Sequence, residues 1–263
     1  MIDDTHKELT NAAPFRLILE LKTPYIPPAT TPSLDGILWG ALSRSLGQPA
    51  SVPLDAIPLT RSHGVFHGSR AVASIPAYRR ENVTFFRSFN REREQMPGAF
   101  FDKKRRPHFA GYPDSEMTKD IGFVVNGISK GFFKTLMNTY EAVTDQFADR
   151  DSALLRVAFF GHGDLERVRT LLRFLPGIGR KVRQGYGLIG DVRIEAIETD
   201  LSLVLDGRPM RPIPVDAWVA LGGDPALAAR PMSIAPPYLV SPHIMAVAPE
   251  GSLFVRVPEE VLV

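Results

Sequence analysis

Two hydrophobic periods mark the N-terminal part of the chain. Large apolar residues occupy every second position from Phe15 to Leu21, which predicts a β-strand over residues 14–28 with one buried face. Residues 33–47 instead carry an apolar stripe at helical spacing, between a serine that can cap a helix and a glycine that can end it. This pattern predicts a helix that begins after Ser33 and stops at Gly47.

The middle of the chain has a weaker pattern. Residues 63–76 alternate enough to predict a second strand, but from Tyr78 to about Asp151 basic and aromatic residues mix without a clean period. We interpret this section as an inserted arm. Within it, residues 120–129 predict a strand, and residues 131–149 have apolar side chains at helical spacing, which predicts a helix.

A regular pattern returns after the arm. Residues 152–164 predict a strand, Asp164 can cap a helix that ends near Leu175, and residues 188–205 predict a last strand or hairpin. The order of these elements predicts an α+β fold: a ferredoxin-like (RRM-type) βαββαβ domain with a long thumb insertion and a small C-terminal β-rich extension. The expected domains are 1–77 with 151–205, the inserted thumb 78–150, and a proline-rich extension 206–263.

The 263-residue chain has a net charge of only +2, but this charge is unevenly distributed. Residues 79–109 hold nine Lys and Arg against four Asp and Glu, and residues 167–187 hold six basic residues and no acidic one. Two basic stretches in an otherwise acidic chain favour a polyanionic partner. For either stretch taken singly, a solvated surface face is the alternative.

Several classes of protein are excluded or disfavoured by composition. No cysteine is present, which excludes disulfides, cysteine-ligated zinc and thiol catalysis. No apolar run reaches the roughly 18 residues of a membrane span. The N-terminal segment 1–15 lacks the basic and apolar regions of a signal peptide, so we expect a cytoplasmic protein that does not contact a membrane.

The stretch 175–187, LPGIGRKVRQGYG, combines four glycines with four basic or amide side chains. It lacks the Gly-Lys-Ser/Thr of a phosphate-binding P-loop, and it follows a helix, whereas a dinucleotide fingerprint follows a strand. Successive backbone N–H groups of such a loop can bind anionic oxygens, and its Arg and Lys side chains add positive charge. The sequence therefore predicts a loop that grips a nucleic-acid backbone; the alternative is a tight connector with basic side chains in solvent.

This loop resembles the glycine-rich loop of the CRISPR repeat-associated proteins, the RAMP superfamily, which has the form G-x-G-[KR]-x-x-x-x-G-[FY]-G. The matching positions are Gly177, Gly179, Arg180, Gly185, Tyr186 and Gly187. Two other stretches, TPSLDGILWGALSR after the first strand and PPYLVSP in the tail, are similar to the Cas-five-like subunit of type IV CRISPR effector complexes. The likeness covers the chain from about residue 14 to 245.

The resemblance implies a non-catalytic RNA-binding subunit, without metal or cofactor, of a ribonucleoprotein complex for antiviral defence. It would cap the 5′ handle of the CRISPR RNA (crRNA) and contact the backbone-forming RAMP subunit and a large-subunit-like protein. Target DNA is a further candidate partner. The predicted RNA-binding residues are Gly177, Gly179, Arg180, Lys181, Arg183, Gln184, Gly185, Tyr186 and Gly187 of the loop, and Arg79, Arg80, Lys103, Lys104, Arg105 and Arg106 of the thumb.

Two alternatives remain open beside the binding subunit. Some relatives in the superfamily cleave the guide-RNA precursor without metal, through a histidine, tyrosine or lysine that acts as general acid or base. A crRNA-processing endoribonuclease is therefore the main alternative, and a generic RNA-binding scaffold is the third. Candidates for a catalytic role are His63, His67, His108, His162 and Tyr186.

Four residues outside the loop are also interpreted from the sequence. HGVFH, residues 63–67, is not the H-E-x-x-H of a zinc protease, so metal binding by this histidine pair alone is disfavoured. His63, His67 and Arg70 are expected near the RNA-binding face. Asp35 falls in the first turn of the predicted helix, where a carboxylate complements the helix dipole, and we interpret it in that role.

Overall fold

The computed structural model describes residues 9, 11–28, 31–47, 52–72, 78–89, 99–101, 107–109, 119–125, 129–145, 155–238 and 241–249. The chain divides into two compact units, and each is described by itself. The first consists of residues 1–79 and 143–263, and the second of residues 80–142.

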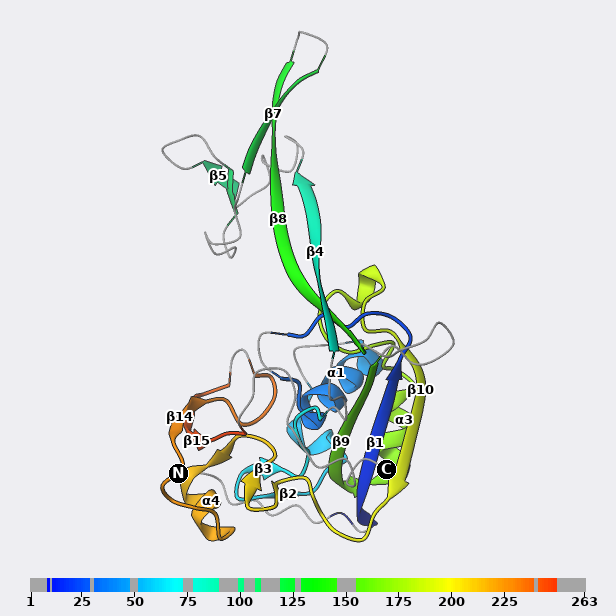
Figure 1. The fold of residues 1–263 in the computed structure, drawn as a ribbon, viewed down its shortest axis with the longest axis vertical. Coiled ribbons are helices and arrows are strands. Elements are labelled where there is room, and N and C mark those ends of the chain that lie inside the picture. Colours follow the sequence, from blue (N-terminus) through cyan, green and yellow to red (C-terminus); the bar gives the residue numbers. More distant parts are fainter. Residues whose placement is uncertain are drawn as a thin grey trace. The chain divides into compact units, whose positions relative to one another are not determined.

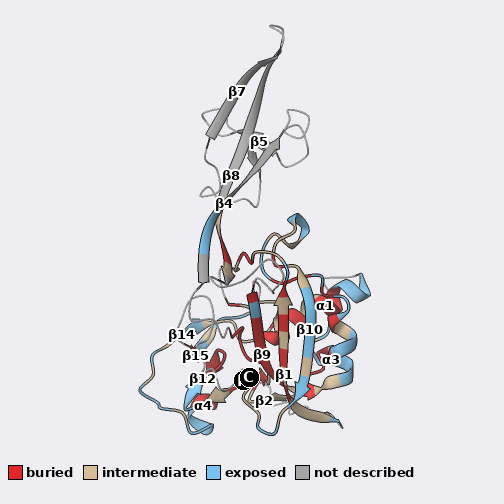
Figure 2. Ribbon diagram, turned by 45° about the vertical axis from the view of Figure 1, so that its right-hand side comes forward, coloured by how far each residue is buried: buried red, intermediate tan, exposed pale blue. Residues whose placement is uncertain are grey.

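A three-stranded antiparallel sheet forms the centre of the first unit (Figure 1). Strand β1 (Ala12–Leu21) lies between β9 (Leu155–Asp164) and β10 (Ile189–Ala196), in the order β10-β1-β9. From Phe15 onward, buried and partly buried residues alternate along β1, which confirms a strand here and its period of two, but the strand ends at Leu21 and does not extend to residue 28 as predicted. Strand β10 is exposed along most of its length (Figure 2), because it forms one edge of this sheet.

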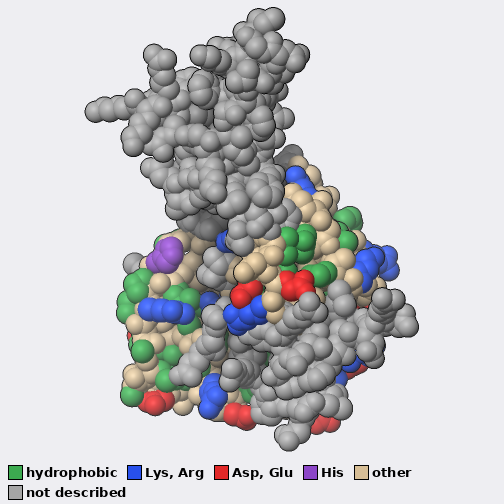
Figure 3. Space-filling model, turned by 45° about the horizontal axis from the view of Figure 1, so that its top comes forward, with side chains coloured by type: hydrophobic (Ala, Val, Ile, Leu, Met, Phe, Trp, Pro, Cys, Tyr) green, Lys and Arg blue, Asp and Glu red, His purple; other side chains and the backbone are tan. Residues whose placement is uncertain are grey.

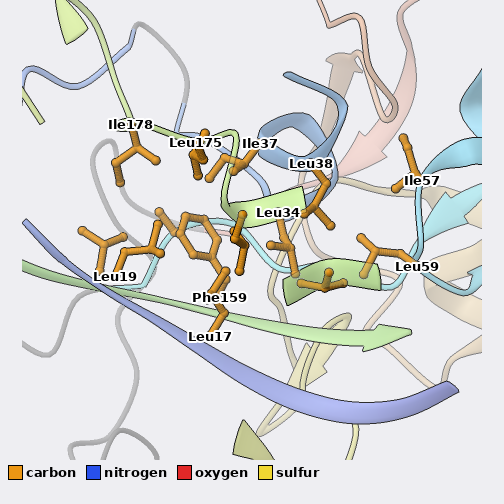
Figure 4. Packing of buried hydrophobic residues seen from close by; sticks show 14 of the residues in the cluster. Leu17, Leu19, Leu34, Ile37, Leu38, Ile57, Leu59, Phe159, Leu175 and Ile178 are labelled. Atoms are coloured by element: carbon orange, nitrogen blue, oxygen red, sulfur yellow. The ribbon is translucent and has the colours of Figure 1, made fainter. Parts of the chain in front are cut away.

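Two helices cover the apolar face of this sheet. Helix α1 (Leu34–Leu46) ends at Gly47 in a left-handed conformation, as predicted, and α3 (Leu165–Leu172) packs beside it. Figure 4 shows Leu17 of β1, Phe159 of β9 and Leu38 of α1 in one core, and each of these side chains is fully buried. The apolar stripes read from the sequence therefore meet in a common hydrophobic interior.

Helix α3 begins with the cap that the sequence predicts. The Asp164 side chain accepts a hydrogen bond from the backbone N–H of Arg167 at 3.1 Å. We expect Asp164→Ala to lower the free energy of unfolding by about 1 kcal/mol, because this N–H then loses its partner. Asp164→Asn keeps an acceptor oxygen and should lose much less; equal losses in urea denaturation would contradict a role as cap.

The predicted second strand over residues 63–76 is wrong as one continuous element. The structure has a hairpin of β2 (Arg61–Ser62) and β3 (Val65–Phe66), closed by a turn in which His63 and Gly64 both have positive φ. After the hairpin, single antiparallel bridges join Gly68 and Val72 to β9. The alternation of apolar and polar residues does not predict the tight turn that interrupts the strand.

A second hydrophobic cluster lies in the C-terminal part of this unit. Strands β13 (Ile213–Pro214), β15 (Ile244–Val247) and β14 (Ala229–Met232) form an antiparallel sheet in that order. Strands β11 (Val204–Leu205) and β12 (Arg208–Pro209) pair separately. The short helix α4 (Val215–Ala220), which the sequence analysis did not predict, buries Trp218 completely.

The second unit consists of strands in its described residues. Strand β8 (Ser129–Asp145) pairs with β7 (Lys119–Val125) and with β4 (Tyr78–Phe89), in the order β4-β8-β7, and β5 (Ala99–Phe101) pairs with β6 (Pro107–Phe109). The strand predicted within 120–129 is confirmed, but the helix predicted for 131–149 is wrong. The aromatic and β-branched residues of this segment favour a strand. Antiparallel pairing with β7 forms the backbone hydrogen bonds of that strand.

The fold is mixed α and β, with mostly antiparallel strands and few helices in the described residues. A short 3₁₀ helix, η1 (Leu54–Ala56), precedes β2, and another, η3 (Val182–Gln184), lies in the glycine-rich loop. Among the described residues, no helix is long and apolar enough to span a membrane.

Candidate nucleic-acid interface

The glycine-rich loop is bound at its base to the segment that follows β1. The backbone N–H of Arg180 donates to the carbonyl of Ile26 at 2.7 Å, and that of Gly187 donates to the carbonyl of Pro24 at 2.8 Å. The two sides of the loop are also joined to each other, because the N–H of Ile178 donates to the carbonyl of Gly187 at 2.9 Å. The loop is therefore a folded lobe with a fixed base.

Two glycines are needed where the base approaches other backbone. Gly179 has φ +87°, and an added Cβ would lie 2.5 Å from the carbonyl oxygen of Ile26. Gly187 has φ +63°, and its Cβ would overlap the carbonyl oxygen of Ile178. Both positions combine a left-handed backbone with a close approach, and only glycine satisfies both demands.

The expectation that successive N–H groups of this loop bind anionic oxygens is not met along most of it. Seven N–H groups of residues 175–187 donate to oxygens within the chain; they belong to Leu175, Ile178, Arg180, Gln184, Gly185, Tyr186 and Gly187. These groups close the base of the loop and the turn around η3. Contacts to a polyanion must therefore come mainly from side chains.

The tip of the loop carries exposed basic and amide side chains. Arg180, Arg183 and Gln184 are exposed, and Lys181 is half-buried beside them. Arg173, just before the loop, is also exposed, and neither it nor Arg183 forms an ion pair within the described residues. On the face that Figure 3 shows, coloured Lys and Arg side chains form several separate groups, some beside acidic ones. Basic side chains are thus not gathered into one patch on the face that this figure shows.

The predicted thumb residues are only partly described. Lys103, Lys104, Arg105 and Arg106 lie outside the described residues. Arg79 lies in β4, but its side chain is also outside the described part, whereas Arg80 is exposed and forms an ion pair with Glu141 on β8 at 3.1 Å. The second basic stretch therefore remains a prediction.

The sheet face opposite the helices is not a base-stacking surface in its described residues. Glu20 on β1 accepts from Arg156 on β9 at 3.1 Å and from Arg193 on β10 at 2.9 Å. Arg16 pairs with Glu195 at 2.7 Å. These cross-strand pairs neutralise one another, so this part of the face lacks the excess positive charge of an RNA-recognition sheet. Phe160 also lies on this face, but it is buried in a cluster with Val72 and Met210 and is not open to a base.

Of the catalytic candidates, the structure brings His67 and His162 together, with ring centroids 5.8 Å apart. His63 lies in the β2–β3 turn, and the side chain of His108 is outside the described part. Strand pairing places His162 opposite Pro14 of β1. Pro14 is seven residues, about 23 Å, from Leu21, the end of β1 nearest to residues 24–26, which the glycine-rich loop contacts. His67, which packs beside His162, therefore lies at the end of the sheet away from the glycine-rich loop, and its expected closeness to an RNA-binding face remains a prediction.

Arg70, which the sequence analysis expects near the RNA-binding face, is only 7% exposed. Burial lowers the pKa of its guanidinium to about 10, so the group remains charged at neutral pH. A side chain that is buried to this extent is not a surface contact for RNA.

Asp35 belongs to a buried network that the sequence analysis did not foresee. Its Oδ2 accepts from Arg211 at 3.1 Å and from the Tyr238 hydroxyl at 2.6 Å, and both charged side chains are fully buried. Tyr238 in turn accepts from the Ser33 hydroxyl at 2.8 Å, so this hydroxyl does not cap α1. The assignment of Asp35 to the helix dipole is incomplete, since its Oδ2 binds long-range partners.

Arg211 and Tyr238 keep their protons despite burial. Burial alone lowers the pKa of Arg211, but the Asp35 carboxylate and Tyr238 outweigh it and hold the pKa above the ordinary value. Burial, with Asp35 next, raises the pKa of Tyr238 far above that of a free tyrosine, so its hydroxyl keeps the proton that it donates. Arg211 also donates to the carbonyls of Phe66 and Ile234, at 2.7 and 2.6 Å.

Comparison with known proteins adds nothing to this geometry. No family model matches the chain, and no curated protein matches it significantly.

Proposed function

We propose that this protein is a non-catalytic RNA-binding subunit of a type IV-like CRISPR effector complex, and that it holds the 5′ handle of the crRNA with its glycine-rich loop. The observation that carries the proposal is the anchored loop itself. Glycines fix its base to residues 24–26, and its tip presents Arg180, Arg183 and Gln184 to solvent. Such a tip suits phosphate oxygens that repeat along a nucleic-acid strand.

The strand order supports a ferredoxin-like βαββαβ arrangement as part of this proposal. The sheet has the order β10-β1-β9, and residues 68–72 bridge the free side of β9 in antiparallel fashion. Numbered as core strands, this is the order 4-1-3-2, with α1 and α3 as the two helices. The glycine-rich loop then lies between the second helix and the last strand, as in the RAMP pattern.

The two stretches that are similar to the Cas-five-like subunit also meet in space. Ser33 and Asp35 belong to the first stretch, and Tyr238 belongs to the second. All three share the buried hydrogen bonds described above, although about 200 residues separate them in sequence. One cluster would account for both similarities, which supports the same family.

The partners follow from the proposal. The backbone-forming RAMP subunit and a large-subunit-like protein would be its neighbours, and target DNA remains a candidate ligand of the assembled complex. A cytoplasmic location, where guide RNA is made and used, goes with this role.

We expect the triple variant Arg180→Ala/Lys181→Ala/Arg183→Ala to bind 5′-handle RNA about 10–100-fold more weakly than the parent at low salt, with a salt slope smaller by about 2. Three lost phosphate contacts account for both effects. Fluorescence anisotropy of labelled handle, full repeat and scrambled RNA, with EDTA, measures them. The matched control is Arg193→Ala/Arg208→Ala/Arg230→Ala, which removes the same charge at exposed positions outside the loop.

Two outcomes would contradict the proposal. Equal affinity for handle and scramble would indicate a generic RNA scaffold. Cleavage of the repeat in EDTA, abolished by His67→Gln or His162→Gln, would indicate the processing endoribonuclease; the closeness of these two rings is the observation in its favour.

A further inference from the structure

Two histidines and an aspartate meet at the end of the sheet opposite the glycine-rich loop. His67 follows β3, His162 lies near the C-terminal end of β9, and Asp200 lies in the loop after β10; Figure 1 shows the β2–β3 hairpin beside that end of β9. One potential ligand atom from each side chain lies within 4.8 Å of the other two. We propose that these three side chains bind one divalent transition-metal ion of the Zn²⁺ type, a site independent of the proposed RNA-binding function.

Each candidate ligand is already oriented by a further hydrogen bond. The partners are Ser62 Oγ for Nε2 of His67 at 2.6 Å, Thr60 Oγ1 for Nδ1 of His162 at 2.7 Å, and the N–H of Ser202 for Oδ1 of Asp200 at 2.8 Å. Metal-binding histidines usually make such a bond with the ring nitrogen that does not bind the metal. The pattern leaves Nδ1 of His67, Nε2 of His162 and Oδ2 of Asp200 as the ligand atoms.

Without metal, Nδ1 of His67 and Oδ2 of Asp200 share a hydrogen bond of 2.6 Å. Bonds of about 2.0–2.2 Å to Zn²⁺ place tetrahedral ligands about 3.4 Å apart, so these two atoms would separate by less than 1 Å. Their side chains are 17% and 27% exposed, which lets water reach a fourth position. Two nitrogens and one oxygen suit Zn²⁺ and are a poor set for Mg²⁺ or Ca²⁺.

The electrostatic surroundings favour a bound cation. Burial lowers the pKa of His162, which keeps its imidazole neutral at pH 7. Burial alone would raise the pKa of Asp200, but hydrogen bonds from His67 and Ser202 outweigh it and hold the pKa below its ordinary value. After burial, Asp200 acts on the pKa of His162 by raising it, and His67 by lowering it.

The same hydrogen bonds allow a competing interpretation. Ser62, His67 and Asp200 are linked in the order of a serine-hydrolase relay, with Oγ on Nε2 and the carboxylate on Nδ1. That relay needs one imidazole, and it does not explain why His162 lies within ligand distance of both partners. We therefore favour the metal, and the test includes the relay as an outcome.

The test uses the full chain, expressed without a histidine tag, stripped with EDTA and dialysed. Isothermal titration calorimetry with Zn²⁺ should give one ion per chain, and thermal unfolding should shift to higher temperature in proportion to ln[Zn²⁺] and return with EDTA. Mg²⁺ at the same concentration should do neither. Binding should weaken as the pH is lowered, because protons compete with the metal for its ligand atoms.

His162→Gln and Asp200→Asn should each weaken Zn²⁺ binding by more than about 100-fold, and Ser62→Ala by about tenfold. His243→Gln, at an exposed histidine outside the cluster, is the matched control and should bind as the parent does. Circular dichroism establishes that each variant is folded, and Asp200→Glu, which retains a carboxylate, covers the case in which Asp200→Asn is not. Unchanged binding in the cluster variants, or no stoichiometric binding by the parent, would overturn the proposal. So would labelling by a fluorophosphonate that is lost in Ser62→Ala.

Discussion

Replacing Asp35 with alanine is expected to lower the free energy of unfolding by about 3–5 kcal/mol. Asp35 and Arg211 are both fully buried, and their ion pair of 3.1 Å is the main compensation for removing two charges from water. The substitution leaves the guanidinium of Arg211 buried without its counter-charge. Because Arg211 also donates to three backbone carbonyls, of Phe66, Gly68 and Ile234, it cannot move into solvent without giving up those bonds.

A double substitution separates the loss of the pair from the loss of one partner. Asp35→Leu/Arg211→Met removes both charges and keeps apolar volume, so it should recover much of the stability that either single change loses. Tyr238→Phe is a milder test and should cost about 1–3 kcal/mol, since Asp35 keeps its guanidinium partner but loses a hydroxyl. Urea denaturation of the parent, of Asp35→Leu, of Arg211→Met, of the double variant and of Tyr238→Phe measures all of these differences in free energy. A double variant as unstable as the sum of the singles would show that charge compensation does not hold this contact together.

The residues in this network show which parts of the fold can be predicted from sequence. The strand from Phe15 and the helix after Ser33 were predictable, because their periods and end residues act over a few neighbours. The pair of Asp35 with Arg211 spans 176 residues and leaves no local pattern. The 131–149 segment was misassigned because its apolar spacing fits a helix, whereas pairing with β7 decides for a strand.

The candidate sites divide in the same way. The glycine-rich loop is a local device, so its motif could be read directly, and the structure gives its glycines a packing reason. The cluster of His67, His162 and Asp200 arises from three separate segments, and only the Asp-x-Ser turn that fixes Asp200 is visible in the sequence. The sequence instead suggests the pair His63 and His67, but His63 lies in the turn between β2 and β3, and His67 joins the cluster with His162 and Asp200.

The geometry of the loop, and not only its charge, should decide RNA affinity. In Gly179→Ala the new Cβ would lie 2.5 Å from both the Ile26 oxygen and the Tyr25 ring, in a backbone with φ +87° that alanine avoids. We expect the base of the loop to detach from residues 24–26 and handle-RNA affinity to fall by about tenfold or more, at unchanged net charge. The entropy of a loose tip then opposes each phosphate contact.

Gly185→Ala is the matched control, because Gly185 has φ +91° but nothing lies within 4 Å of its added Cβ. It carries the conformational cost of about 1–2 kcal/mol without the overlap, so it should keep most of the affinity. Limited trypsin digestion gives a readout that does not depend on RNA: cleavage after Arg180 or Lys181 should be faster in Gly179→Ala than in the parent or in Gly185→Ala. Faster digestion with unchanged affinity would mean that charge alone binds the RNA. Unchanged digestion would mean that the contact with Ile26 does not hold the loop in place. Rigidity of the loop could then not explain its affinity for RNA.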